Sequence, residues 1–144
     1  MITINDLGKI KCTCCGETIT IENASIHNRK KGSYRPICKE CKKIRDLEYQ
    51  EKRVAAQKAI TKERKKEGCC CCGDKRHYVL DFHHVDPKTK VERVSHMIGR
   101  YSTDSIIKEM DKCVLLCSNC HRKFHQYEIS NNITLSDYLK MKSA

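Results

Sequence analysis

Apolar residues are sparse in the middle of the chain. Residues 42–67 contain no Pro or Gly and are rich in Lys, Arg, Glu, Gln, Ala and Leu, which are strong helix formers. The few apolar side chains of this segment make only a narrow stripe. The pattern therefore predicts a long helix that packs lightly along one side and ends at Gly68.

Shorter apolar patterns follow on the C-terminal side. Two of them predict strands, a run at residues 78–85 that Asp86-Pro87 ends and a short buried run at residues 114–116. Three more predict helices, at residues 102–110, 119–127 and 135–141, and the first of these begins with a cluster of N-cap residues. Strands and helices mixed in so short a chain indicate a small α+β fold.

Two Cys-x-x-Cys pairs mark residues 1–41 as a separate unit. Four thiolates from two such pairs match tetrahedral zinc, and a Gly behind the first pair lets the backbone turn tightly. The predicted ligands of this zinc-ribbon-like unit are Cys12, Cys15, Cys38 and Cys41. Cys14 has no matching partner and is interpreted as a bystander. A unit of this size cannot fold on apolar burial alone, so zinc would be part of the fold.

A second cysteine cluster opens residues 68–144. Cysteine occupies all of positions 69–72. Gly73 follows the last of them, as Gly16 follows the first Cys-x-x-Cys pair, and this spacing selects the two outer cysteines. The predicted ligands of a second structural zinc are Cys69, Cys72, Cys117 and Cys120. The pairing could instead be shifted to Cys70 or Cys71. Cys113 begins an apolar run and is interpreted as a core residue.

Composition points the same way as the cysteine spacing. The chain has 144 residues, of which 12 are Cys, 33% are charged, two are Phe and none is Trp, so a single large hydrophobic core is not expected. The first residues lack a basic leader followed by an apolar run, which favours a reducing, cytoplasmic compartment and zinc over disulfides. No apolar run approaches the ~18 residues of a membrane span.

Positive charge is concentrated in one part of the chain. The formal net charge is +11, and residues 29–67 alone carry 15 Lys and Arg against 6 Asp and Glu. A basic segment of this kind is typical of a polyanion-binding protein, because each neutralised phosphate releases counterions. Two uses of the long helix remain open, a spacer that lays basic side chains along a duplex and a dimerisation helix.

Histidines suggest a third metal centre beside the second cysteine cluster. A single Cys₂His₂ finger is excluded, because Cys120 and His121 are adjacent, whereas such a finger needs about twelve residues between its pairs. On a helix, His121 and His125 share a face and can hold a metal together with one imidazole of His83-His84. The other imidazole would be free to take a proton from water, a combination suited to phosphodiester hydrolysis.

These residues resemble the HNH nucleases of the ββα-metal fold, particularly phage and bacterial members with zinc knuckles beside the site. The resemblance covers about residues 68–125, through the second set of knuckles, the Asp-Phe-His-His entry and the His-x-x-x-His helix. It implies that His83, His121 and His125 are ligands of a catalytic divalent metal and that His84 is the general base. Asp81 would be the carboxylate that positions neighbouring groups.

The resemblance also implies the organisation and activity of the protein. Residues 1–41 would be the zinc-ribbon-like unit, residues 42–67 a basic linker helix, and residues 68–144 an HNH nuclease domain. The implied activity is metal-dependent cleavage of double-stranded DNA by a homing, restriction or phage nuclease, in a bacterial or phage-infected cell, with a homodimer as one assembly. Two structural Zn²⁺ and one catalytic ion are expected, Mg²⁺ or Mn²⁺ first and Ni²⁺ or Zn²⁺ as alternatives.

One position departs from the family pattern. The central Asn of the family falls on Lys112, and a lysine cannot accept the hydrogen bonds of an amide. Asp111 could substitute from the next position, or the loop could be braced in another way. The departure keeps an alternative open, a non-catalytic zinc-binding module that recognises nucleic acid, and beyond it a zinc-stabilised protein adaptor.

Overall fold

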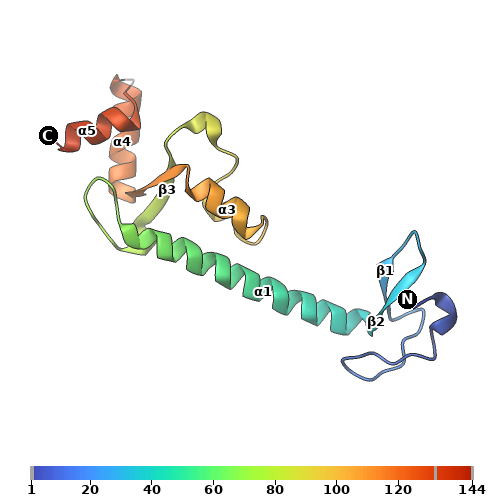
Figure 1. Ribbon diagram of the computed structural model, residues 1–144. Helices are drawn as coiled ribbons and strands as arrows, with labels where there is room; N and C mark the ends of the chain where they lie inside the picture. Colours follow the sequence, from blue (N-terminus) through green and yellow to red (C-terminus); the bar gives the residue numbers. More distant parts are fainter. Residues whose placement is uncertain (1, 132, 144) are drawn as a thin grey trace. The chain divides into compact units, whose positions relative to one another are not determined.

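The computed structural model describes residues 2–131 and 133–143, and it has a small α+β fold (Figure 1). The chain divides into two compact units, Met1–Lys52 and Arg53–Ala144. The division falls inside the long helix α1, Lys39–Arg64, so each unit holds one end of that helix. Within the described ranges, none of the helices combines the length and apolarity needed to cross a membrane.

The first unit is a hairpin with a loop-rich N-terminal part. After the 3₁₀ turn η1 (Ile4–Asp6), strand β1 (Ala24–Asn28) pairs antiparallel with β2 (Ser33–Cys38), and β2 runs directly into α1. The buried apolar side chains are few: Cys12, Ile19, Ala24, Ile37 and Cys38. Because two of the five are cysteines, apolar burial alone gives this unit little stability.

Helix α1 confirms the predicted helix, but the part of it that lies in the second unit buries polar side chains rather than the expected apolar stripe. It begins at Lys39, earlier than predicted, and the 3₁₀ turn η2 (Lys65–Glu67) leads to Gly68, whose φ of 86° ends it. Its buried residues are polar, Gln57 and Thr61. The Gln57 amide donates to the Tyr101 carbonyl at 3.0 Å and accepts from the Gly99 N–H at 2.8 Å. A buried, satisfied amide therefore joins the helix to its neighbours.

The second unit contains the other predicted elements. Strand β3 (Leu80–His84) pairs antiparallel with β4 (Cys113–Cys117), and helix α4 (Ser118–Asn131) follows β4 without a break. Between the strands lie η4 (Pro87–Thr89) and the helices α2 (Val94–Met97) and α3 (Thr103–Met110). Helix α5 (Leu135–Ser143) packs beside α4. The first strand is shorter than predicted, because its expected beginning forms the 3₁₀ turn η3 (His77–Val79).

Strand β3 directs adjacent side chains to different helices. Successive residues of a strand project to opposite faces. The ring of His83 packs against Phe124 of α4, with ring centroids 5.0 Å apart, whereas His84 contacts Glu109 of α3. Apolar residues of α2 and α3 form one buried cluster, and residues of β3, β4, α4 and α5 form another. Side chains of β3 therefore contact the helices of both clusters.

Candidate metal centres and the imidazole cleft

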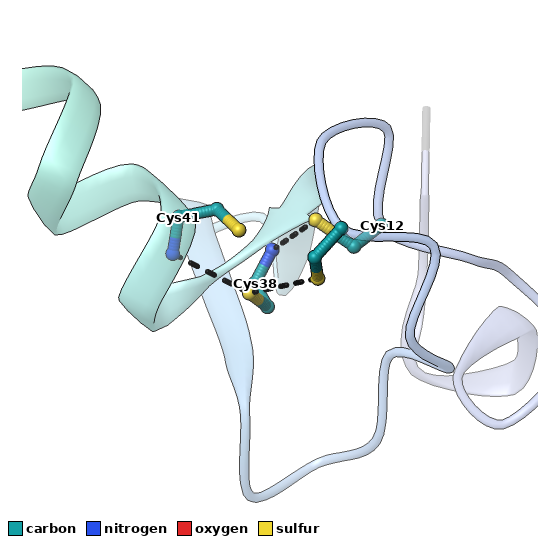
Figure 2. Close-up of side chains that lie close together, drawn as sticks. Cys12, Cys38 and Cys41 are labelled. Atoms are coloured by element: carbon teal, nitrogen blue, oxygen red, sulfur yellow. Dashed lines mark hydrogen bonds between the residues drawn. The ribbon is translucent and has the colours of Figure 1, made fainter.

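The first predicted cysteine quartet comes together in the first unit. One sulfur from each of Cys12, Cys15, Cys38 and Cys41 lies within 4.8 Å of the other three. Cys38 ends β2 and Cys41 lies in the first turn of α1, so the strand-to-helix junction sets their spacing (Figure 2). The Sγ atoms of Cys15 and Cys38 are 3.9 Å apart. Zinc with four thiolates at ~2.3 Å requires about 3.8 Å between sulfurs, which this quartet matches.

Backbone N–H groups favour the thiolate form at one corner of this quartet. The N–H groups of Cys14 and Cys38 each lie 3.4 Å from the Cys12 sulfur. Hydrogen bonds from the Cys15 and Cys38 backbones are the main reason why the pKa of Cys12 falls to about 6. By contrast, its thiol neighbours raise the pKa of Cys41. Such a cluster stays partly protonated until a cation compensates its charge.

The second predicted quartet comes together in the second unit. Its members are Cys69, Cys72, Cys117 and Cys120, again with four sulfurs within 4.8 Å. The Sγ atoms of Cys72 and Cys117 are 3.7 Å apart, close to the ~3.8 Å edge of a zinc tetrathiolate. Cys70 and Cys71 are not among its members, so the described structure favours the unshifted pairing. The chain therefore has two cysteine quartets that could hold structural zinc.

The second quartet repeats the electrostatic pattern of the first. Burial raises the pKa of Cys69, but N–H groups from Cys117 and Cys71 outweigh that effect and lower it to about 7. The N–H of Cys117 lies 3.2 Å from the Cys69 sulfur. Burial and the adjacent thiols raise the pKa of Cys120. In both units a backbone-stabilised thiolate thus lies beside thiols that need a cation to ionise.

A third cluster consists of imidazoles from β3 and α4. One ring nitrogen from each of His83, His121 and His125 lies within 4.8 Å of the other two. The closest approaches are 2.9 Å between His83 Nδ1 and His121 Nε2, and 3.1 Å between His121 Nε2 and His125 Nε2. His121 and His125 come from successive turns of α4, as their spacing predicted. Three convergent ring nitrogens could hold a divalent cation.

Carboxylates lie beside the outward nitrogens of two of these rings. Asp81 Oδ2 lies 3.6 Å from His121 Nδ1, and Glu128 Oε2 lies 2.9 Å from His125 Nδ1. Metal-binding histidines commonly direct the second ring nitrogen to a carboxylate, which fixes the tautomer and makes the inner nitrogen more basic. The expected neighbour Asp81 is therefore near the cluster. Glu128 was missed, although its i, i+3 spacing from His125 on a helix was a usable signal.

The third imidazole is held neutral by its surroundings. Burial, reinforced by the neighbouring rings of His121 and His125, lowers the pKa of His83 to about 4. At neutral pH its lone pair is consequently available to a cation rather than to a proton. Three observations thus fit a divalent ion: the ring nitrogens converge, carboxylates lie beside two of the rings, and the third ring is neutral.

The three imidazoles open onto a cleft of about 530 Å³ that His84 also lines. Cationic side chains from two other segments border the same cleft: Lys65, Lys90 and Arg93. Asp81 is the acidic residue among its lining groups. The cleft therefore combines a candidate metal site with an excess of positive charge, which favours an anionic ligand.

His84 is held by a buried carboxylate of α3. Its side chain is 8% exposed, and its Nε2 lies 2.8 Å from Oε1 of Glu109, which is 2% exposed. The same carboxylate accepts from the Val91 N–H at 2.7 Å. Burial raises the pKa of Glu109, but Lys112 and these other donors outweigh it and hold the pKa at about 2. Because Nε2 is engaged, His84 could exchange a proton with the cleft only through Nδ1.

The side chain of Lys112, at the position where the resemblance implies an Asn, braces the loop by donating hydrogen bonds. Its Nζ donates to the Thr89 carbonyl at 2.9 Å and to Glu109 Oε2 at 2.7 Å, and its own carbonyl accepts from the Val85 N–H at 3.0 Å. Asp111 does not substitute for the amide in this way, since it pairs with Arg64. The segment between β3 and α2 is therefore tied to the end of α3 by hydrogen bonds, from Lys112 Nζ to the Thr89 carbonyl and from the Val91 N–H to Glu109.

Comparison of the chain with models of protein families, with curated proteins and with solved structures finds no match.

Proposed function

We propose that this chain is a metal-dependent endonuclease that hydrolyses phosphodiester bonds of DNA, with the chemistry in its second unit. The observation that carries the proposal is the convergence of three imidazoles in a cleft that a fourth histidine and three cationic side chains also line. A divalent ion held by His83, His121 and His125 would supply positive charge to a phosphate in the cleft.

The role proposed for His84 is that of general base. Its ring is oriented by Glu109, and a neutral imidazole can take a proton from an attacking water at neutral pH. An imidazole whose second nitrogen contacts a carboxylate is held in one tautomer, and the resulting imidazolium is stabilised. Glu109, the brace for this ring, was not anticipated from the sequence.

The basic middle of the chain supports nucleic acid as the substrate. Residues 29–67 carry 15 Lys and Arg against 6 Asp and Glu, and most of the cationic side chains of α1 are exposed. Phosphate contacts of this kind give affinity without sequence preference and weaken as salt rises. We propose that α1 binds the sugar–phosphate backbone, while the cleft receives one of its phosphates.

A plasmid assay tests the proposal. Zinc-loaded protein is incubated with supercoiled plasmid and Mg²⁺, Mn²⁺, Ni²⁺ or additional Zn²⁺, with and without excess EDTA. We expect nicked or linear product with at least one ion, and none with EDTA. The His84→Ala variant should bind DNA but lose cleavage by a factor of about 10² or more. His77→Ala, which changes an exposed histidine outside the cleft, is the matched control.

One observation favours a second candidate, a zinc-stabilised module that binds nucleic acid without cutting it. His84 is 8% exposed and bonded to a buried carboxylate, as a purely structural histidine would be. This candidate predicts salt-sensitive DNA binding with intact plasmid under every metal tested.

A further inference from the structure

The cleft contains one cationic side chain whose surroundings differ from those of the other lysines of the basic segment. Lys65 follows α1 in the turn η2, and its side chain is half-buried in the wall of the cleft. Its Nζ lies 5.8 Å from the ring centroid of Phe82, the residue between Asp81 and His83 on β3. The Lys65 ammonium therefore lies on the side of the cleft formed by the strand that carries His83.

Lys65 is held in this position without a carboxylate partner. Within residues 2–131 and 133–143, it forms no ion pair, and burial lowers its pKa, with Asp81 only partly opposing the shift. An ammonium that has lost some hydration and gained no counterion interacts strongly with an anion that replaces the missing water. Its Nζ lies over the face of the Phe82 ring, a cation–π contact that favours this position of the head group.

The two other cations of the cleft have a different character. Lys90 and Arg93 are exposed, and they belong to the segment between η4 and α2. Exposed cations contribute to affinity and its dependence on salt, but little to the stabilisation of charge that develops in a reaction. A partly desolvated cation fixed beside the reacting group acts on that developing charge.

We propose that Lys65 contacts a non-bridging oxygen of the phosphate that is cut, while Lys90 and Arg93 bind neighbouring phosphates of the same strand. This inference rests on the proposed function and names a catalytic contact within it. During hydrolysis, water oxygen bonds to phosphorus and the proton of that water passes to His84. The P–O bond to the leaving strand breaks, its electron pair stays on the leaving oxygen, and that oxygen takes a proton from solvent water. Lys65 takes no proton in this sequence, and its charge stabilises the phosphoryl oxygens as negative charge grows on them.

Adjacent lysines of the same helix end provide the matched comparison. Lys66 has a side chain that is 70% exposed and pairs with Glu63 at 2.7 Å, outside the cleft. Lys65→Met keeps an unbranched apolar side chain of similar length and removes the charge. Lys65→Arg keeps the charge and should restore part of the activity. Thermal unfolding of each variant shows whether the fold is retained.

The experiment measures single-turnover cleavage and binding of a labelled DNA duplex in the same buffer. We expect Lys65→Met to slow cleavage by about 10²-fold with less than a few-fold change in Kd, as for other single charge-stabilising donors. Lys66→Met should change neither by more than a few-fold. Charge-removing substitutions at Lys90 or Arg93 should mainly weaken Kd and reduce the salt slope by about one per cation.

Equal cleavage rates for Lys65→Met and Lys66→Met, with active unsubstituted protein, would overturn the contact and leave the proposed nuclease activity standing. Weaker duplex binding by Lys65→Met with an unchanged cleavage rate would also overturn the contact, because Lys65 would then only bind the DNA backbone. If the unsubstituted protein binds the duplex but does not cut it with any of the four ions, the nuclease proposal and the contact fall together.

Discussion

The buried carboxylate of Glu109 offers a sharp test of how the second unit is held together. It accepts from three partners at 2.7–2.8 Å: His84 Nε2, the Val91 N–H and Lys112 Nζ. In Glu109→Gln the shape is kept, but the side-chain nitrogen turns a donor toward at least one of these donors. Lys112 loses its counterion as well. The variant isolates the charge of Glu109 and its acceptor capacity.

The expected loss follows from these contacts. Removing one partner of a fully buried ion pair costs about 3–5 kcal/mol, but the Lys112 side chain left behind is 33% exposed, so solvent screening should reduce the loss to about 2–3 kcal/mol. With a urea m-value of about 2 kcal/mol/M, the midpoint should fall by about 1–1.5 M. The control is Glu63→Gln, which changes a side chain that is 70% exposed and should shift stability by less than ~0.5 kcal/mol.

The same variant has a defined pH dependence. The folded-state pKa of Glu109 is about 2, below the ordinary value of a glutamate. Its stabilisation is therefore complete above the unfolded pKa of ~4.3 and is lost as pH falls toward the folded value. The stability gap between wild type and Glu109→Gln should be constant from pH 7 to about 5 and should narrow below that. A gap under 1 kcal/mol at pH 7, or one that widens on acidification, would show that the charge of Glu109 does not hold these contacts together.

Three other predictions concern the metal centres and the end of α1. Purified protein should retain two Zn²⁺ per chain by mass spectrometry under native conditions; Cys72→Ser should lose one of them, and Cys70→Ser should keep both. Glu128→Gln should weaken divalent-ion binding at the imidazole cluster by about 10–100-fold in calorimetry, with the zinc content unchanged. Gly68→Ala should destabilise the fold by more than ~1 kcal/mol in urea, because φ is 86° and the new Cβ would lie 3.1 Å from Lys75 Cγ.

The parts of the structure that the sequence predicted are those set by local spacing. Local geometry is fixed within a few residues by the Cys-x-x-Cys pairs, by the i, i+4 histidines and by the polar helix. The structure brings both cysteine quartets and the imidazoles together as expected. The pairing within residues 69–72 was resolvable because Gly73, with a φ of 72°, supplies the turn that the knuckle needs.

The parts that the sequence did not predict depend on contacts between distant segments. Glu109 looks like one exposed acid on a short amphipathic helix, and only the packing of α3 beside β3 brings it to His84. Gln57 lies among helix formers, and its buried role becomes visible only with the loop at Gly99 and Tyr101. The sequence shows that the Lys112 side chain cannot accept a hydrogen bond. Only the structure shows the groups to which this side chain donates, the Thr89 carbonyl and Glu109.

In the proposed mechanism, the imidazole cluster holds the ion used for cleavage. The most direct test of this role is single-turnover cleavage of a labelled DNA duplex by wild type and His121→Ala, both with their two zinc sites loaded, during titration with Mn²⁺ or Mg²⁺. We expect ion-dependent cleavage by wild type, and unchanged duplex affinity with at least a 10²-fold slower rate for the variant. Cleavage by His121→Ala at the wild-type rate would contradict it.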